Sequence, residues 1–380
     1  MAGKYSFAEF FSGGGMARIG LGNSWKCVLA NDNDPQKCEI YRKNFSDSHL
    51  QQCDILDLPN SLLHKNIDLY WASSPCQDFS LAGNCRGLEG KKSSVFHPWM
   101  EQVKQAVCAG HAPKIIAFEN VVGLLSARGG SDFEIVVHEI ASIGYSVGAL
   151  ILDAKKFLPH SRPRLFVIGV LEKTDVPSAL SSASLSSGSA RIQKAYDKLP
   201  DALKSKWVWW NIEDIEARST SLVDIVDKMV PEKLWFSEER TKKLVDLMNE
   251  THAAKLNMAK KSGKLVIGTV YKRGRPDNTG KIVQCAELRL DGVAGCLRTP
   301  RGGSSKQTLM IIKDTHVRAR LLTAFETSKL MGLPEWYSMP ENFNQAYQLA
   351  GDGVAVPVVR FLAEKIFEPI LESISIAKAA

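Results

Sequence analysis

The chain has 380 residues, 44% hydrophobic and 23% charged, a composition typical of a globular protein long enough for more than one domain. No run approaches the roughly 18 uninterrupted apolar residues of a membrane-spanning helix, and the N-terminus lacks a signal-peptide pattern. The eight cysteines form no CxxC pair and no Cys/His cluster, which argues against a disulfide framework and a metal site. We therefore expect a soluble, unexported protein without a metal. The net charge of +7 is modest, but the basic residues gathered between Lys255 and Arg275 suggest a polyanionic partner.

The first half of the chain alternates short apolar runs with segments of helical length. Segments such as 96–109 and 132–143 lie between these runs and are long enough for helices. This alternation predicts βαβ units and a mostly parallel, doubly wound α/β sheet with helices on both faces. The runs typical of strands cover 5–11, 26–32, 67–74, 114–121, 145–154 and 164–171.

The pattern changes after residue 170. Residues 178–190 read "SALSSASLSSGSA", which is typical of a linker or surface loop. The stretch 191–300 is more charged and shows no repeated βαβ pattern, and we interpret the tryptophans of "WVWW" (207–210) as core residues. We therefore predict three parts: a large domain over 1–177, a smaller domain over 178–310 and a C-terminal segment over 311–380 that returns to the first domain.

A glycine-rich turn follows the first predicted strand in "FFSGGGMARIGL" (10–21). Such a turn lets backbone N–H groups approach a ligand, although ordinary tight turns have the same pattern. Asp32 ends the next strand about 20 residues further on, where a carboxylate often holds the ribose of a nucleoside cofactor. Asp54 ends the third strand, and the turn has no phosphate-binding lysine. These features favour a nucleoside cofactor without a triphosphate.

A cysteine stands at the end of another predicted strand, in "SSPCQDFS" (73–80). Pro75 prevents the strand from continuing, so the sulfur of Cys76 is expected at the carboxyl edge of the sheet. Glu119 in "FENVVG" (118–123) ends the following strand, and apolar surroundings there would raise its pKa. Arg162 and Arg164 open the last strand. Singly these could be a core cysteine, a capping glutamate and surface arginines, but together they indicate nucleophilic chemistry.

In this order the motifs resemble those of the bacterial cytosine-5 DNA methyltransferases of restriction–modification systems. The resemblance covers about 5–170 and 290–370. It rests on "FAEFFSGGG", "ANDND", "CDILDL", "SSPCQDFSLAG", "FENV", "HSRPR", "RTPRGG", "RLLTAFETSKLMGLPEWY" and "YQLAGDGVAVPVV".

The resemblance implies a Rossmann-like methyltransferase sheet that binds S-adenosylmethionine, together with a smaller target-recognition domain. It also implies that Cys76 adds to carbon-6 of a cytosine swung out of the duplex, while Glu119 binds ring nitrogen-3 and the exocyclic amine. Arg162 and Arg164 would hold the base and support Glu119. The residues expected to bind the cofactor are Phe11, Gly13, Gly15, Asp32, Asn33, Asp54 and Pro75.

The same resemblance implies that duplex DNA is the partner. The segment from Lys255 to Arg275 holds seven basic residues and no acidic one, and it lies in the region where this family keeps its target recognition. A solvated basic surface is the alternative interpretation of this segment. The residues expected to contact DNA are Gln77, Ser80, Lys91, Lys92, Lys272, Arg273, Arg275, Arg298 and Arg301. A cytoplasmic bacterial monomer, with or without a companion restriction endonuclease, fits this class.

Four positions differ from the usual family pattern. Met16 follows the turn where a second glycine is common, and Asn33 stands where a tryptophan often stacks on adenine. His160 replaces a frequent glutamine and Asp352 a common asparagine.

Two other functions are also compatible with the sequence. One is an RNA cytosine-5 methyltransferase with the same catalytic domain, and the other is a non-catalytic DNA-binding regulator.

Overall fold

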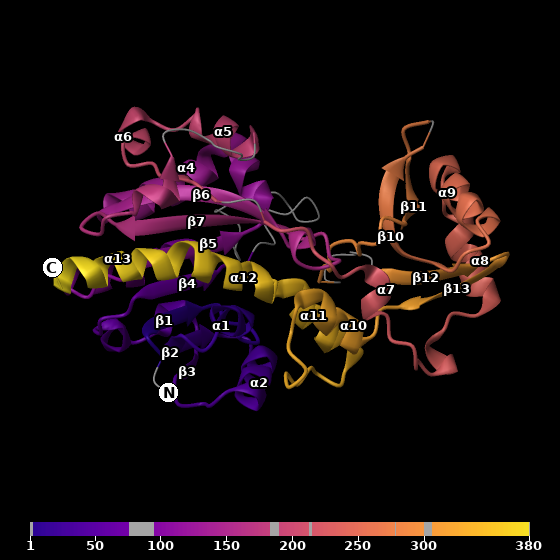
Figure 1. The fold of residues 1–380 in the computed structure, drawn as a ribbon, viewed down its shortest axis with the longest axis horizontal. Coiled ribbons are helices and arrows are strands. Elements are labelled where there is room, and N and C mark those ends of the chain that lie inside the picture. Colours follow the sequence, from indigo (N-terminus) through magenta and orange to yellow (C-terminus); the bar gives the residue numbers. More distant parts are fainter. Residues whose placement is uncertain are drawn as a thin grey trace. The chain divides into compact units, whose positions relative to one another are not determined.

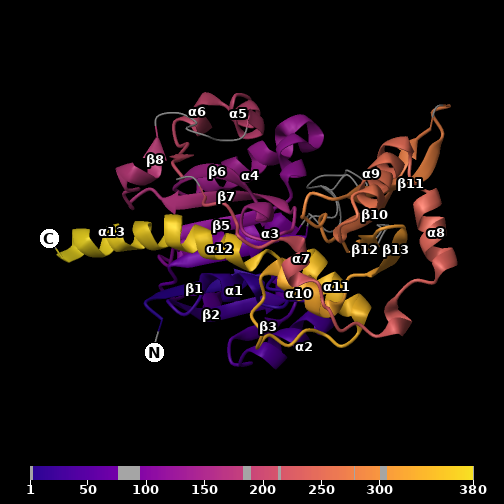
Figure 2. The same cartoon turned by 45° about the vertical axis from the view of Figure 1, so that its right-hand side comes forward.

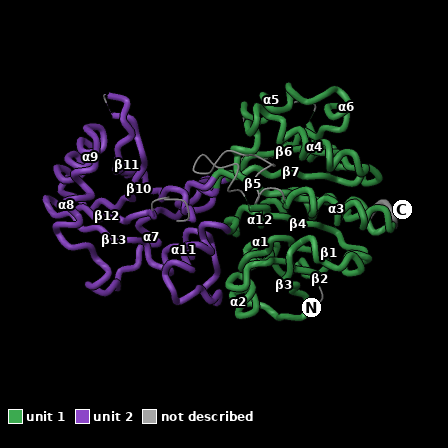
Figure 3. Tube along the Cα trace, turned by 180° about the vertical axis from the view of Figure 1, so that it is seen from behind, with its two compact units in different colours: residues 1–153, 163–215, 353–380 green, residues 154–162, 216–352 purple. Residues whose placement is uncertain are grey.

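A computed structural model describes residues 3–75, 95–182, 190–212, 215–277, 279–299 and 306–379. The chain forms two compact units, and neither is a continuous segment (Figure 3). The first unit comprises residues 1–153, 163–215 and 353–380, and the second comprises 154–162 and 216–352. These bounds differ from those of the predicted domains, because 178–215 belongs to the first unit and 311–352 to the second.

A seven-stranded sheet in the order β3-β2-β1-β4-β5-β7-β6 forms the centre of the first unit (Figure 1). All pairs from β3 to β5 are parallel, whereas β7 is antiparallel to both of its neighbours. The predicted doubly wound sheet is confirmed, and the reversal of β7 is an addition that the apolar runs do not specify. The strands are β1 Tyr5–Phe10, β2 Trp25–Asp32, β3 Leu50–Gln52, β4 Leu69–Ser73, β5 Ile115–Asn120, β6 Tyr145–Asp153 and β7 Pro163–Leu171.

Helices cover both faces of this sheet. Because successive side chains of a strand point to opposite faces, Tyr70 and Trp71 of β4 are buried on different sides. Tyr70 belongs to the core that Trp99 of α3 (Phe96–Cys108) and residues of α4 (Ser131–Ser142) complete. Trp71 contacts Phe367 with ring centroids 6.4 Å apart. Phe367 closes a π-helical turn, Ala363–Phe367, between α12 (Val356–Leu362) and α13 (Glu368–Ala379), which cross in front of the strands in Figure 1.

The remaining elements of the first unit are short. Helices α1 (Met16–Leu21) and α2 (Pro35–Asn44) follow β1 and β2, and α5 (Ala190–Tyr196) and α6 (Asp201–Lys204) follow the serine-rich segment. Strands β8 (Ser181–Ser182) and β9 (Trp209–Trp210) pair with each other. Trp207 is partly buried and packs against Phe133 of α4 and Tyr196 of α5, at centroid distances of 6.1 and 5.5 Å, while Trp210 is buried, so both pack in or against the core as predicted.

An antiparallel four-stranded sheet in the order β11-β10-β12-β13 organises the second unit. Helices α8 (Glu238–Asp246) and α9 (Glu250–Lys261) lie beside it, as Figure 2 shows, and enclose a core with Val270 and Met310. The strands are β10 Val266–Pro276, β11 Ile282–Arg289, β12 Thr308–Lys313 and β13 His316–Leu321. The other helices are α7 Leu222–Ile225, α10 Ala324–Met331 and α11 Phe343–Asp352.

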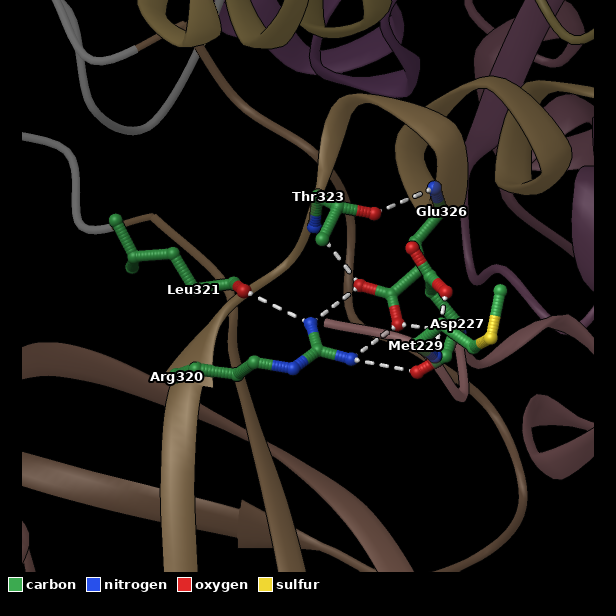
Figure 4. Close-up of polar contacts among 6 residues, drawn as sticks. All are labelled: Asp227, Met229, Arg320, Leu321, Thr323 and Glu326. Carbon is green, nitrogen blue, oxygen red and sulfur yellow. Dashed lines mark hydrogen bonds and ion pairs between the residues drawn. The ribbon is translucent and has the colours of Figure 1, made fainter. Parts of the chain in front are cut away.

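A buried ion pair joins β13 to α10 in this unit (Figure 4). The fully buried Arg320 guanidinium donates to both carboxylate oxygens of Glu326, at 2.7 and 2.6 Å. Glu326 also accepts from the backbone N–H groups of Thr323 and Asp227, at 2.8 and 2.9 Å. A buried charge is costly unless it is paired and hydrogen-bonded. This set of bonds therefore fixes the start of α10 against the backbone at Asp227.

Candidate active site

The glycine turn after β1 has a backbone that requires glycine. Gly13 and Gly15 have left-handed φ values of 55° and 76°, and Phe11 shares this region at 56°. A Cβ at Gly15 would lie 2.4 Å from the ring of Phe45, whereas one at Gly13 would have no protein atom within 4 Å. The turn is therefore packed on its Gly15 side and open on its Gly13 side. Met16, the departure from the family pattern, is buried at the start of α1.

Asp32 is bonded to this turn. Its carboxylate accepts from the Gly13 N–H at 2.8 Å and from the Asp34 N–H at 2.9 Å. The side chain is buried, and this burial raises the pKa of its carboxyl above the ordinary value. In the described part of the turn, the buried Ser12 hydroxyl makes no hydrogen bond, and such a group usually has a partner.

Asn33 and Asp54 lie together at the ends of the neighbouring strands. The Asn33 amide donates to the Asp54 carboxylate at 3.5 Å, and Asp54 accepts from the Leu56 N–H at 3.1 Å. Because β3, β2 and β1 are adjacent and parallel, their carboxyl ends meet at one edge of the sheet. The structure thus brings together Phe11, Gly13, Gly15, Asp32, Asn33 and Asp54, and their role in binding a cofactor stays a prediction.

The chain leading to the predicted nucleophile ends at the same edge. Ser73 of β4 is paired in register with Glu119 of β5, and Pro75 follows two residues later. Cys76 lies outside the described residues, as do Gln77, Ser80, Lys91, Lys92 and Arg301.

Glu119 forms an ion pair with Arg164. The Arg164 Nε lies 3.0 Å from Glu119 Oε1, and their side chains are only 11% and 8% exposed. Arg164 reaches this position because β7 runs antiparallel to β5 and begins where β5 ends. The geometry agrees with the expected support of Glu119 by Arg164, and this role stays a prediction. The sequence predicted apolar surroundings for the Glu119 carboxyl. The structure differs from this prediction, because the Arg164 guanidinium lies beside the carboxyl.

Arg162 and His160 belong to the second unit. The Arg162 guanidinium is buried and donates to the carbonyl oxygens of Leu297 and Gly351, at 2.9 and 2.7 Å. His160 Nε2 accepts from the Leu297 N–H at 3.2 Å, so its Nδ1 carries the proton and donates to the Leu330 carbonyl at 2.9 Å. Burial lowers the pKa of His160, which keeps the ring neutral. The contact of Arg162 with the target base stays a prediction.

The basic residues of the second unit do not share one surface. In the antiparallel register, Lys272 lies opposite Ala286, which belongs to the core under α9. Arg273 and Arg275 point to the other face, where both lie near Glu287, a residue that the sequence did not single out. Alternation along the strand was the signal that could have separated Lys272 from the two arginines.

Asp352, another departure from the family pattern, accepts a hydrogen bond from the Thr299 hydroxyl. Arg298, the residue before this threonine, lies with its guanidinium over the ring of Tyr271, at 5.7 Å from the centroid. Asp352 therefore fixes the backbone next to a predicted DNA-contacting arginine.

Within the described ranges there is no helix with the length and apolar character needed to cross a membrane. The same ranges hold no group of three or more His, Cys, Asp or Glu side chains arranged to bind a metal.

Comparison with solved structures gives the class of fold. The chain aligns with the Schizosaccharomyces pombe Dnmt2 methyltransferase over 96% of its length and 99% of that chain, with a TM-score of 0.60 and 18% identity. A Spodoptera frugiperda DNMT2 mutant gives a TM-score of 0.62 at 17% identity, with 96% and 99% coverage. The fold is thus the methyltransferase fold, with a second unit that includes an antiparallel sheet.

Sequence comparison gives the family. Residues 5–368 match the model of the C-5 cytosine-specific DNA methylases, and the chain belongs to this family. It is 26% identical to the type II methyltransferase M1.ScrFI of Lactococcus lactis subsp. cremoris, over 97% of this chain and 80% of that protein. It is 25% identical to M.HpaII of Haemophilus parainfluenzae, over 97% and 90%. The protein is therefore a DNA cytosine-5 methyltransferase that uses S-adenosylmethionine.

Proposed function

We propose that the chain methylates a cytosine swung out of duplex DNA and that Cys76 is its nucleophile. The observation that supports this most is the buried Glu119–Arg164 pair at the carboxyl edge of the sheet. Ser73, three residues before Cys76, is paired in register with Glu119, so the chain enters the 76–94 segment beside this carboxylate. The glycine turn and Asp32 stand at the same edge, where a methyl donor can be held.

In this proposal the residues divide the chemistry among them. The Cys76 thiolate adds to carbon-6 while Glu119, held by Arg164, donates a proton to ring nitrogen-3 and accepts a hydrogen bond from the exocyclic amine; the proton returns to Glu119 when the thiolate leaves. Electron density then moves to carbon-5, which becomes the nucleophile for the methyl group. A base removes the carbon-5 proton, the double bond between carbons 5 and 6 re-forms, and the thiolate leaves. Because both side chains are almost fully buried, water screens the attraction between Arg164 and Glu119 only weakly.

S-adenosylmethionine, when bound, supplies the methyl group on its sulfonium. The residues at the glycine turn fit such a group, because the turn is open at Gly13 and has the unpartnered Ser12 hydroxyl beside it. Asp32 would hold the ribose hydroxyls, and Asn33 with Asp54 would line the adenine side, near Phe11. Pro75 would close the site from β4.

Several finer assignments belong to the same proposal. The second unit would recognise the target sequence, with Arg273, Arg275, Arg298 and Arg301 contacting DNA and Lys272 adding non-specific attraction to its phosphates. The chain would act as a monomer in a bacterial cytoplasm, and a companion endonuclease would make it part of a restriction–modification system.

A trapping experiment tests the chemistry directly. The purified chain is incubated with S-adenosylmethionine and a duplex that carries 5-fluorocytosine at the target, where the fluorine cannot be removed as a proton. We expect a covalent protein–DNA band on a denaturing gel, and we expect Cys76→Ser to abolish this band while cofactor binding persists. A persistent band in Cys76→Ser would overturn the assignment of the nucleophile.

A second assay separates the alternatives. Methyl transfer from labelled S-adenosylmethionine is compared on duplex DNA and on tRNA. Transfer to duplex DNA alone supports the proposal, and transfer to tRNA alone supports the RNA methyltransferase. Binding of duplex DNA without transfer to either substrate would indicate a regulator.

A further inference from the structure

The outer part of the β10–β11 hairpin has two chemically different faces. On one face Val270 and Leu288 are paired and belong to the core that α9 covers. Because side chains alternate, Tyr271, Arg273 and Arg275 project from the opposite face, where Tyr271 is paired with Glu287. We call these four residues, Tyr271, Arg273, Arg275 and Glu287, the hairpin face.

Glu287 holds the arginines of the hairpin face in place. Arg275 contacts one carboxylate oxygen through both Nε, at 2.6 Å, and Nη2, at 2.5 Å. The Arg273 Nε lies 4.0 Å from the other oxygen. Glu287 is 23% exposed, whereas Arg273 and Arg275 are 42% and 49% exposed. The acid is therefore the more deeply placed partner, and the guanidinium groups are the part that faces solvent.

Tyr271 adds an aromatic support between two guanidinium groups. Arg273 lies 5.5 Å from the centroid of its ring, and Arg298 lies 5.7 Å from it. Cation–π contacts of this length restrict where a long side chain can go. The hairpin face and Arg298 together carry three arginines and one glutamate, so their formal charge is positive and suits a polyanion.

Positioned arginines on a two-stranded ribbon suit the major groove of DNA. The groove is about 12 Å wide and admits such a ribbon, and its commonest specific contact is an arginine fork on O6 and N7 of guanine. An arginine has five N–H donors, so two bonds to Glu287 leave three for a base edge. Because the rotamer is already fixed, less conformational entropy is lost when the base is bound.

We propose that the hairpin face reads duplex DNA, with Arg275 as the residue that recognises a guanine and Glu287 as its positioning residue. This inference rests on the proposed function, and it goes beyond it by separating the basic residues into two groups. Arg273 and Arg298 flank the reading position. Lys272 projects from the face of the hairpin that α9 covers and contributes only non-specific attraction to phosphates.

The test begins with the wild-type chain expressed in cells without cytosine methylation of their own. Bisulfite sequencing gives the methylated sequence, and the dissociation constant of that duplex is then measured with the full chain. The duplex is compared with copies in which each guanine of the target in turn is 7-deazaguanine, which lacks the N7 acceptor. We expect one guanine at which this change weakens wild-type binding about tenfold.

Three variants complete the experiment. Arg275→Ala should weaken binding of the normal duplex by about 10- to 100-fold and should show no further loss with 7-deazaguanine at that position. Glu287→Gln should give a smaller loss, with methylation spreading to sequences that differ at the same base pair. Lys272→Ala is the matched control from the other face, and it should weaken binding of all duplexes by less than about threefold. Thermal unfolding of each variant shows whether the second unit is intact.

The outcomes are distinguishable from a failure of the proposed function. Arg275→Ala and Glu287→Gln chains that methylate the wild-type target with wild-type affinity would overturn this inference alone. An equal loss of target discrimination in Lys272→Ala, or wild-type binding that no 7-deazaguanine substitution weakens, would do the same. A wild-type chain that methylates RNA or no cytosine at all would overturn the proposed function, and this inference with it.

Discussion

Replacing Arg164 by methionine would leave the Glu119 carboxylate buried without its guanidinium. Both side chains are about nine-tenths buried and their charged atoms are 3.0 Å apart. Removing one partner of such a pair costs about 3–5 kcal/mol, whereas exposed pairs are worth only about 0.2–1 kcal/mol. We therefore expect Arg164→Met to lower the free energy of unfolding by about 3 kcal/mol or more.

A double-mutant cycle with Glu119→Gln isolates the pair itself. The free energy of unfolding is measured by urea titration for the wild type, both single variants and the double variant. We expect a coupling energy of about 2 kcal/mol or more, because the double variant removes both buried charges together. The pair of Lys206 with Glu172, with side chains 39% and 43% exposed in the same unit, is the control and should give less than about 1 kcal/mol. Equal coupling energies in the two cycles would refute this reasoning.

Three further predictions concern β1, the glycine turn that follows it and Asp32. Burial raises the pKa of the Glu9 carboxyl from 4.5 to about 8, so the folded chain keeps a proton that the unfolded chain has lost. The free energy of unfolding of the wild type should therefore fall as the pH rises from 4.5 to 8. Relative to the wild type, Glu9→Gln should gain roughly 1.4 kcal/mol of stability per pH unit over this range. Curves of unfolding free energy against pH that run parallel for the two chains would contradict this. Gly15→Ala should lower the melting temperature more than Gly13→Ala, because both substitutions strain a left-handed backbone but only the Cβ at Gly15 would meet Phe45; Gly13→Ala should also weaken cofactor binding measured by calorimetry. Asp32→Ala should raise the KM for S-adenosylmethionine with a smaller change in kcat, and an unchanged KM would exclude its role.

The sequence predicted the carboxyl edge of the sheet well, because strand ends can be read from local patterns. Asp32 ends β2, Asp54 follows the end of β3, and Glu119 lies next to the end of β5, while Arg164 lies beside Glu119. The positions of residues with distant partners could not be predicted in this way. The carbonyl groups that Arg162 binds, those of Leu297 and Gly351, are 135 and 189 residues away along the chain. No local pattern encodes such contacts.

The β10–β11 hairpin shows a second reason why site residues could not be predicted from the sequence. A run of basic residues was visible from composition, but its division between two faces depends on the strand register from Val266 to Pro276. Glu287 was missed for the same reason, since its importance comes from a cross-strand neighbour. Charge counting identified the region, and only the pairing of β10 with β11 identified the residues that act together.

The contact between Trp71 and Phe367 also bears on how the protein is made. One face of the central sheet takes its cover from α12, the π-helical turn and α13, which are translated after the whole second unit. During synthesis the ribosome therefore releases β1, β2 and β4 long before this cover exists, and Trp25, which also contacts Phe367, stays uncovered with Trp71. Such a nascent chain exposes an aromatic surface to chaperones and to other unfinished chains. Loss of the last helices by premature termination would leave that surface permanently bare.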